Sequence, residues 1–309
     1  MTFNDDAELD TSDITGGGEG TFGHTGAIIG GGGGILGLIA LVVYTLFGGG
    51  GGSQVLGSGG HGMDLSQLGA GGQYTQKIYD HCKTGADANK DDVCLVVGTV
   101  NSVQGYWKKK FPESTKNNTA WRLTKTNLYS GQTQSKCGMA SNQVGPFYCP
   151  ADRQVYIDAS FFKQLNQRFG SDKGNFAKMY VVAHEYGHAA QDQLGVLGEA
   201  QKDPKGPASG GVKVELMADC FAGMWAKDAS TTKDKNGKTL LKPLTQQDIQ
   251  SALSAASAVG DDTIQQRTQG RVSPENFTHG SAEQRMRWFM AGYNSQNVAT
   301  CNTLKATTL

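Results

Sequence analysis

The stretch "VVAHEYGHAAQDQLG", residues 181–195, decides how the rest of this sequence is interpreted. It places His184 and His188 four positions apart, with Glu185 directly after the first histidine. Side chains at positions i and i+4 of a helix lie on one face, so both imidazoles can reach a single metal ion. The apolar periodicity of residues 171–195 predicts that this stretch is helical.

Two histidines do not complete a catalytic zinc site, which needs three protein ligands and an open position. Glu215 lies on the next predicted helix, residues 212–229, and a short loop makes the two helices antiparallel neighbours. The sequence therefore predicts a site for one Zn2+ ion with His184, His188 and Glu215 as ligands. Asp219, one turn after Glu215, is placed to accept a hydrogen bond from the far nitrogen of a ligating histidine.

Glu185 would lie beside the metal rather than on it, which suits a general base acting on zinc-activated water. The favoured interpretation is a zinc-dependent metallopeptidase that hydrolyses peptide bonds in a peptide or protein substrate. Two alternatives stay open: a buried helix with a structural histidine pair, and a non-catalytic, membrane-anchored envelope scaffold with a structural zinc. His279 precedes a predicted helix that begins at Ser281; it could donate to the oxyanion of the reaction or simply order the turn.

Composition separates the first 72 residues from the rest of the chain. They hold dense glycine tracts, and the first basic residue is Lys77. Residues 26–47 carry no charge and are long enough to cross a bilayer, so we expect a single transmembrane helix there. The predicted organisation is an acidic, glycine-rich cytoplasmic tail at 1–25, this anchor, a glycine-rich linker at 48–72 and a metallopeptidase domain at 73–309. Lysine plus arginine equal aspartate plus glutamate at 28 each, which gives no reason to expect a nucleic-acid partner.

Six cysteines all follow the predicted anchor, and no C-x-x-C motif joins any of them. This favours structural disulfides in an oxidising compartment, although six buried thiols are the alternative. Closeness in sequence favours two pairs, which leaves the last two cysteines for each other. The expected pairs are Cys82 with Cys94, Cys137 with Cys149, and Cys220 with Cys301.

Other segments give weaker expectations for secondary structure. Alternating apolar residues from position 153 to 162 predict a strand, while residues 92–107 fit either a buried helix or a strand. Helices are expected over 245–259, where Thr245 and Asp248 resemble a capping box, and from Ser281, where Gln284 occupies the matching position.

Five motifs occur in order along the chain: "GPFYCPADRQVYID", "VVAHEYGHAAQDQLG", "VELMADCFAGMWA", "AVGDD" and "FTHGSAEQRMRWF". Together they resemble the bacterial neutral zinc metallopeptidase family, whose members are membrane-anchored. The resemblance implies a zincin-like α+β fold, mainly helical, with a small sheet packed on the zinc helix. It implies metal ligation by His184, His188 and Glu215, and catalysis by Glu185. It also implies that a cysteine at position 220 occurs together with one near the C-terminus, Cys301. The tail of this chain is acidic where relatives tend to have basic residues, yet the disulfides favour a single-pass protein of the cytoplasmic membrane with its catalytic domain on the extracytoplasmic side.

Overall fold

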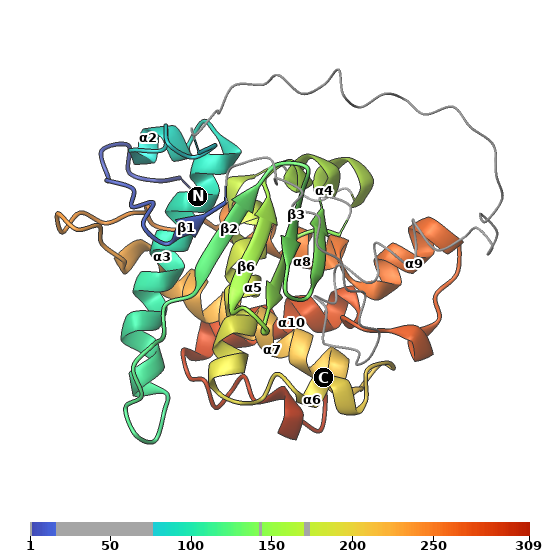
Figure 1. The fold of residues 1–309 in the computed structure, drawn as a ribbon. Coiled ribbons are helices and arrows are strands. Elements are labelled where there is room, and N and C mark those ends of the chain that lie inside the picture. Colours follow the sequence, from blue (N-terminus) through green and yellow to red (C-terminus); the bar gives the residue numbers. More distant parts are fainter. Residues whose placement is uncertain (1, 17–76, 142–143, 170–173) are drawn as a thin grey trace, which may run out of the picture.

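A mixed four-stranded sheet forms one layer of the molecule (Figure 1). The structure is a computed structural model that describes residues 2–16, 77–141, 144–169 and 174–309. The strand order is β1-β2-β6-β5; the first three strands are parallel, and β5 runs antiparallel to β6 at one edge. A separate hairpin pairs β3 with β4. The strands are β1 Ile14–Thr15, β2 Lys125–Tyr129, β3 Gln132–Ser135, β4 Gly138–Ser141, β5 Phe147–Cys149 and β6 Gln154–Asp158.

Helices make up the other layer, and α5 (Asn175–Gln193) lies between them and the sheet. It contacts β5 and β6 on one side and α3, α7 and α8 on others, so almost all of its side chains from Phe176 to Gln191 are buried. The sheet thus packs on the helix that carries the two histidines, as expected. The other helices are α2 Gly85–Ala88, α3 Asp92–Glu113, α4 Phe161–Phe169, α6 Glu199–Lys202, α7 Gly210–Asp228, α8 Gln246–Ala258, α9 Asp261–Gln269 and α10 Ala282–Ser295.

Local sequence signals explain where several helices begin. Thr245 and Asp248 form a capping box at the start of α8, and Ser281 and Gln284 form one at the start of α10, which confirms both predictions. The ambiguous segment from residue 92 is helical, because Asp91 caps it by accepting hydrogen bonds from two backbone N–H groups.

Residues 2–16 belong to the same folded unit as the rest of the described chain. The sequence interpretation separated residues 1–25 from the domain, but β1 pairs in register with β2, and Phe3 is fully buried. The ring of Phe3 occupies space left by Gly98 of α3, where an added Cβ would lie 2.5 Å from it. This amino-terminal segment therefore contributes both a strand and core side chains.

The structure corrects the expectation of an N-terminal transmembrane helix. Among the helices of the described residues, none is both long enough and apolar enough to cross a membrane. The longest, α3, has 22 residues and includes charged side chains at both ends. The predicted span at 26–47 lies outside the described residues, as do the predicted linker at 48–72 and the remainder of the tail. The described residues form a mixed fold of helices and sheet.

All three expected disulfides are present. Cys82 joins Cys94, Cys137 joins Cys149, and Cys220 joins Cys301, so every cysteine of the chain is oxidised. The first two bridges each close a short loop. The third spans 81 positions and ties α7 to the C-terminal segment.

Candidate metal centre

Three buried side chains from α5 and α7 converge on one point. His184 Nε2 lies 3.2 Å from Glu215 Oε2, and His188 Nε2 lies 3.4 Å from Glu215 Oε1. One ligand atom from each residue lies within 4.8 Å of the others, a grouping that could hold a metal ion. The three residues are at most 8% exposed. The structure therefore brings together the ligands predicted from the sequence.

The close approach of α5 and α7 follows from small residues at their contact. A Cβ on Gly187 would lie only 3.0 Å from the backbone of Ala218, so the glycine allows the helices to pack tightly beside the site. Gly187 falls between the two histidines in sequence, and Ala218 falls between Glu215 and Asp219. The same contact thus sets the spacing of the candidate ligands.

Asp219 occupies the supporting position expected for it. Its Oδ1 lies 2.8 Å from His184 Nδ1 and also accepts a hydrogen bond from the hydroxyl of Tyr180. A carboxylate can only accept here, so His184 carries its proton on Nδ1 and leaves Nε2 facing Glu215. On the other side, Arg285 of α10 donates to Asp219 Oδ2 from Nε at 2.8 Å and to Oδ1 from a terminal nitrogen at 3.0 Å.

The charges of the centre fit a bound cation. Glu185, Glu215 and Asp219 are buried carboxylates, and the buried cation Arg285 pairs with Asp219. Burial lowers the pKa of His184, but Asp219 and Glu215 outweigh this and raise it to about 9. Excess negative charge therefore draws protons onto a histidine that would otherwise be neutral. A divalent cation would remove that excess, and two nitrogens with one carboxylate are a donor set that suits zinc.

Glu185 is adjacent to the ligands without being one of them. Its residue is 1% exposed, and its Oε1 has no hydrogen-bond partner among the described residues. Burial raises the pKa of this carboxyl, and the charges of His188 and His184 offset that effect only in part. The group is thus a buried carboxyl with an unused oxygen beside the candidate ligands.

His279 lies in the turn before α10 and is not one of the three converging residues. Its Nδ1 lies 3.2 Å from Asp261 Oδ1, and its Nε2 has no partner among the described residues. Asp261 also accepts backbone N–H bonds from residues 278–280, so this turn is rigidly held. Burial raises the pKa of Glu215, but the charges and hydrogen bonds of His188 and His184, together with the charge of His279, outweigh that effect and hold it well below its ordinary value.

Comparison with known proteins agrees with this geometry. A family profile described as "Putative neutral zinc metallopeptidase" matches residues 4–304. The chain belongs to this family. It is 52% identical over 229 residues to the uncharacterized protein Rv2575 of Mycobacterium tuberculosis, covering 74% of this chain and 76% of that protein. It is 36% identical over 255 residues to the uncharacterized protein YpfJ of Escherichia coli, covering 81% and 83%. No solved structure gave a significant match.

Two residues of this family member's centre were missed by the sequence interpretation. Gln191 follows His188 by three positions on the same helical face, a spacing that could have indicated contact. Arg285 shares the buried face of α10 with Phe289 and Gly292 at positions i, i+4 and i+7. A charged residue in that pattern could have indicated a buried partner of opposite charge.

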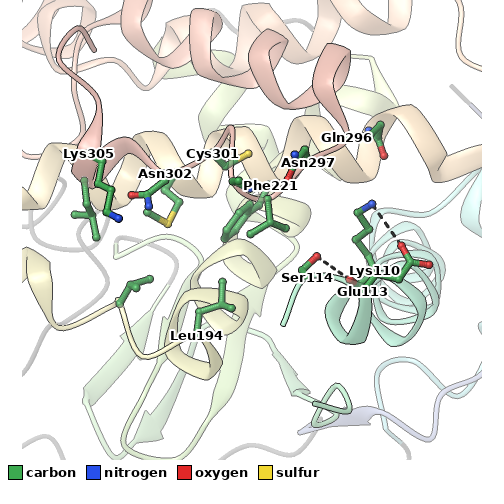
Figure 2. A pocket seen from close by; sticks show the side chains of 15 residues that line it. Lys110, Glu113, Ser114, Leu194, Phe221, Gln296, Asn297, Cys301, Asn302 and Lys305 are labelled. Atoms are coloured by element: carbon green, nitrogen blue, oxygen red, sulfur yellow. Dashed lines mark hydrogen bonds and ion pairs between the residues drawn. The ribbon is translucent and has the colours of Figure 1, made fainter. Parts of the chain in front are cut away.

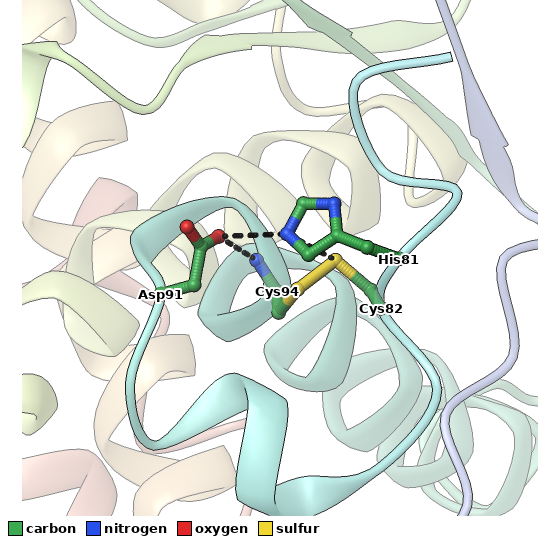
Figure 3. Close-up of side chains that lie close together, drawn as sticks. All are labelled: His81, Cys82, Asp91 and Cys94. Carbon is green, nitrogen blue, oxygen red and sulfur yellow. Dashed lines mark hydrogen bonds and ion pairs between the residues drawn. A yellow bond between two sulfur atoms is a disulfide. The ribbon is translucent and has the colours of Figure 1, made fainter. Parts of the chain in front are cut away.

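A second group of metal-binding side chains lies far from the zinc motif in sequence. His81, Cys82, Asp91 and Cys94 are close together, as Figure 3 shows. Their two sulfurs are joined in a disulfide, which removes both thiolates as ligands. Asp91 is already the cap of α3. This group is therefore a structural crosslink at the start of α3.

The family member also has a pocket of about 560 Å³ beside the Cys220–Cys301 disulfide (Figure 2). Met217 and Phe221 line it from α7. They alternate along that helix with Glu215 and Asp219, so the pocket and the metal centre lie on different faces of α7. The metal centre is thus separate from this pocket.

Proposed function

We propose that this protein is a zinc-dependent metallopeptidase that hydrolyses peptide bonds in a peptide or protein substrate. The observation that carries the proposal is the convergence of His184, His188 and Glu215 at a buried point, with the unused oxygen of Glu185 beside it. Membership of a family described as a zinc metallopeptidase supports the same activity. The three disulfides support the proposal that the protein acts in an oxidising compartment.

In this proposal one zinc ion is held by His184, His188 and Glu215. When bound, zinc supplies a water of lowered pKa and polarises the scissile carbonyl. Asp219 and Arg285 keep His184 oriented with Nε2 toward Glu215. The protein's part is to hold these donors rigidly in a buried site.

Glu185 is the proposed general base. Its raised pKa, caused chiefly by burial, brings the carboxylate closer to the range in which it can take a proton from water and return it to the leaving amine. Its Oε1 has no hydrogen-bond partner among the described residues and can therefore accept that proton. Because the side chain is held within α5, it stays beside the two histidines.

His279 is the proposed donor to the oxyanion that forms on the scissile carbonyl. Asp261 accepts from the Nδ1–H of the ring, and Nε2 has no partner in the described part of the chain. Nε2 therefore acts as a donor in the doubly protonated ring, whose positive charge Asp261 would balance. A donor held in advance by such a contact stabilises developing charge without reorganisation.

The decisive substitution is Glu185→Gln, which keeps the shape and removes the base. We expect zinc content to stay at one ion per chain while cleavage of a peptide library falls by roughly 10²–10⁴-fold. Glu283→Gln is the matched control, because that side chain is 79% exposed on α10. Zinc is measured by metal analysis and cleavage by mass spectrometry, with and without chelator.

The outcomes separate the enzyme from the alternative. Wild-type activity in Glu185→Gln would refute the role of the base. Tight zinc binding by the wild type with no cleavage of any peptide would instead support a non-catalytic scaffold with structural zinc. Loss of zinc and activity together in Glu185→Gln would mean that Glu185 holds the metal centre together.

A further inference from the structure

Gln191 is a fully buried amide in contact with a candidate metal ligand. It lies on α5, one turn after His188, and its Oε1 is 2.8 Å from His188 Nδ1. Its Nε2 donates to the backbone carbonyl of Val214 on α7 at 2.6 Å. Val214 directly precedes Glu215, so this one side chain connects the two helices that together carry all three candidate ligands.

These two contacts determine where the proton of His188 lies. A carbonyl oxygen only accepts, so the amide must turn its NH2 group toward Val214 and its oxygen toward His188. His188 Nδ1 must then donate and carry the proton. Nε2 is then the nitrogen that faces Glu215 Oε1, 3.4 Å away. The amide thus selects the tautomer that a metal ion needs.

The two histidines receive this support from different chemical groups. His184 donates to the carboxylate of Asp219, whose charge is balanced by Arg285, whereas His188 donates to a neutral amide. A second carboxylate at position 191 would add a buried negative charge. The neutral amide gives the same orientation without that charge.

We propose that Gln191 is a positioning residue of the metal centre, which holds His188 in the Nδ1–H tautomer and links it to the helix segment bearing Glu215. This rests on the proposed function, because it assumes that His184, His188 and Glu215 bind zinc. Removal of such a supporting partner lowers metal affinity by about 10–100-fold.

Two substitutions at Gln191 test the two contacts separately. Gln191→Met removes the acceptor for His188 at similar volume, and Gln191→Glu retains an acceptor but loses the donor to Val214. Gln193→Met is the control, since this half-buried amide on the same helix bonds the backbone of Arg122 instead. Zinc affinity of the metal-free full chain is measured by competition with a chromophoric chelator. Visible spectra of the Co2+ forms report ligand geometry, and thermal unfolding of the metal-free forms reports stability.

We expect Gln191→Met to weaken zinc binding about 10–100-fold and to alter the Co2+ spectrum. Gln191→Glu should stay closer to the wild type than Gln191→Met does, and Gln193→Met should match the wild type. Equal zinc affinity in wild type and Gln191→Met, with only the unfolding temperature lowered, would overturn the proposal. Equal losses in Gln191→Met and Gln191→Glu would overturn the tautomer role, because a retained acceptor for His188 would then make no difference to zinc affinity. A wild type that binds no zinc would refute the proposed function instead.

Discussion

Arg285 shows how a single residue sets the charge of the centre. Its side chain is fully buried and donates to Asp219 and to the carbonyl of Val259. Burial raises the pKa of Asp219, but the charges of Arg285 and His184 and the hydrogen bonds from both side chains together outweigh that effect and hold it below the ordinary value. Asp219 therefore stays ionised while it orients His184. Removal of either partner would leave a buried unpaired charge, which costs several kcal/mol.

Asp261 is a second buried carboxylate, and it gives a prediction about pH. Burial raises the pKa of Asp261, but hydrogen bonds from His279 and its neighbours lower it below 3.8. Its stabilising contribution is therefore present above pH 3.8 and disappears as pH falls through the lower folded-state pKa. We expect Asp261→Asn to lower the free energy of unfolding by about 2–4 kcal/mol at neutral pH. Urea unfolding should show that the difference from wild type shrinks in strong acid; a constant difference across that range would contradict the assignment.

At the scale of elements, the contact between α7 and α10 is the closest helix packing around the site. A Cβ on Gly292 of α10 would lie 1.8 Å from the carbonyl oxygen of Cys220, and one on Gly223 of α7 would lie 1.9 Å from that of Phe289. The helices therefore meet backbone to backbone. This approach brings Arg285 from α10 to Asp219 on α7.

Gly292→Ala tests this contact. Alanine normally stabilises a helix relative to glycine by about 1 kcal/mol, but here the new methyl group clashes with backbone that cannot move away. We expect a net loss of about 3 kcal/mol or more, or failure to fold. Gly198→Ala should stay within about 0.5 kcal/mol of wild type, because an added Cβ there meets nothing within 4 Å. Chemical denaturation measures both; a stable Gly292→Ala protein would mean that the helices can separate.

At the scale of the whole molecule, two distant parts of the chain complete one domain. Residues 2–16 supply β1 and several core side chains, and residues from 77 onward supply the rest of the described sheet and helices. Asn89 fastens the amino-terminal segment by bonding both the N–H and the carbonyl of Phe3. The two parts therefore pack into one folded unit.

Phe3→Ala tests whether the amino-terminal segment stabilises the domain. Phe3 is 0% exposed and fits against Gly98, so the substitution leaves a cavity in the core. We expect a loss of about 3–5 kcal/mol in the free energy of unfolding. Zinc binding by the folded protein should be unchanged, because Phe3 packs against Gly98 of α3, whereas the candidate ligands lie on α5 and α7. Val272→Ala, at a side chain that is 41% exposed, is the control. Unchanged stability in Phe3→Ala would show that the segment is dispensable.

The sequence alone determined the local features of this protein. His184, His188 and Glu185 could be predicted as one site because helical geometry fixes which side chains share a face. The capping boxes at Thr245 and Ser281 could be predicted for the same reason, since their partners lie three residues away.

The tertiary structure decided the rest. Three features depend on which surfaces of distant elements meet. They are the pairing of residues 2–16 with the domain, the contact of Arg285 with Asp219, and the hydrogen bond of Gln191 to His188. Spacing along the chain does not contain that information. Buried polar groups must find partners wherever the packing places them, so the partners of Asp219 and Gln191 became visible only when α5, α7 and α10 were assembled.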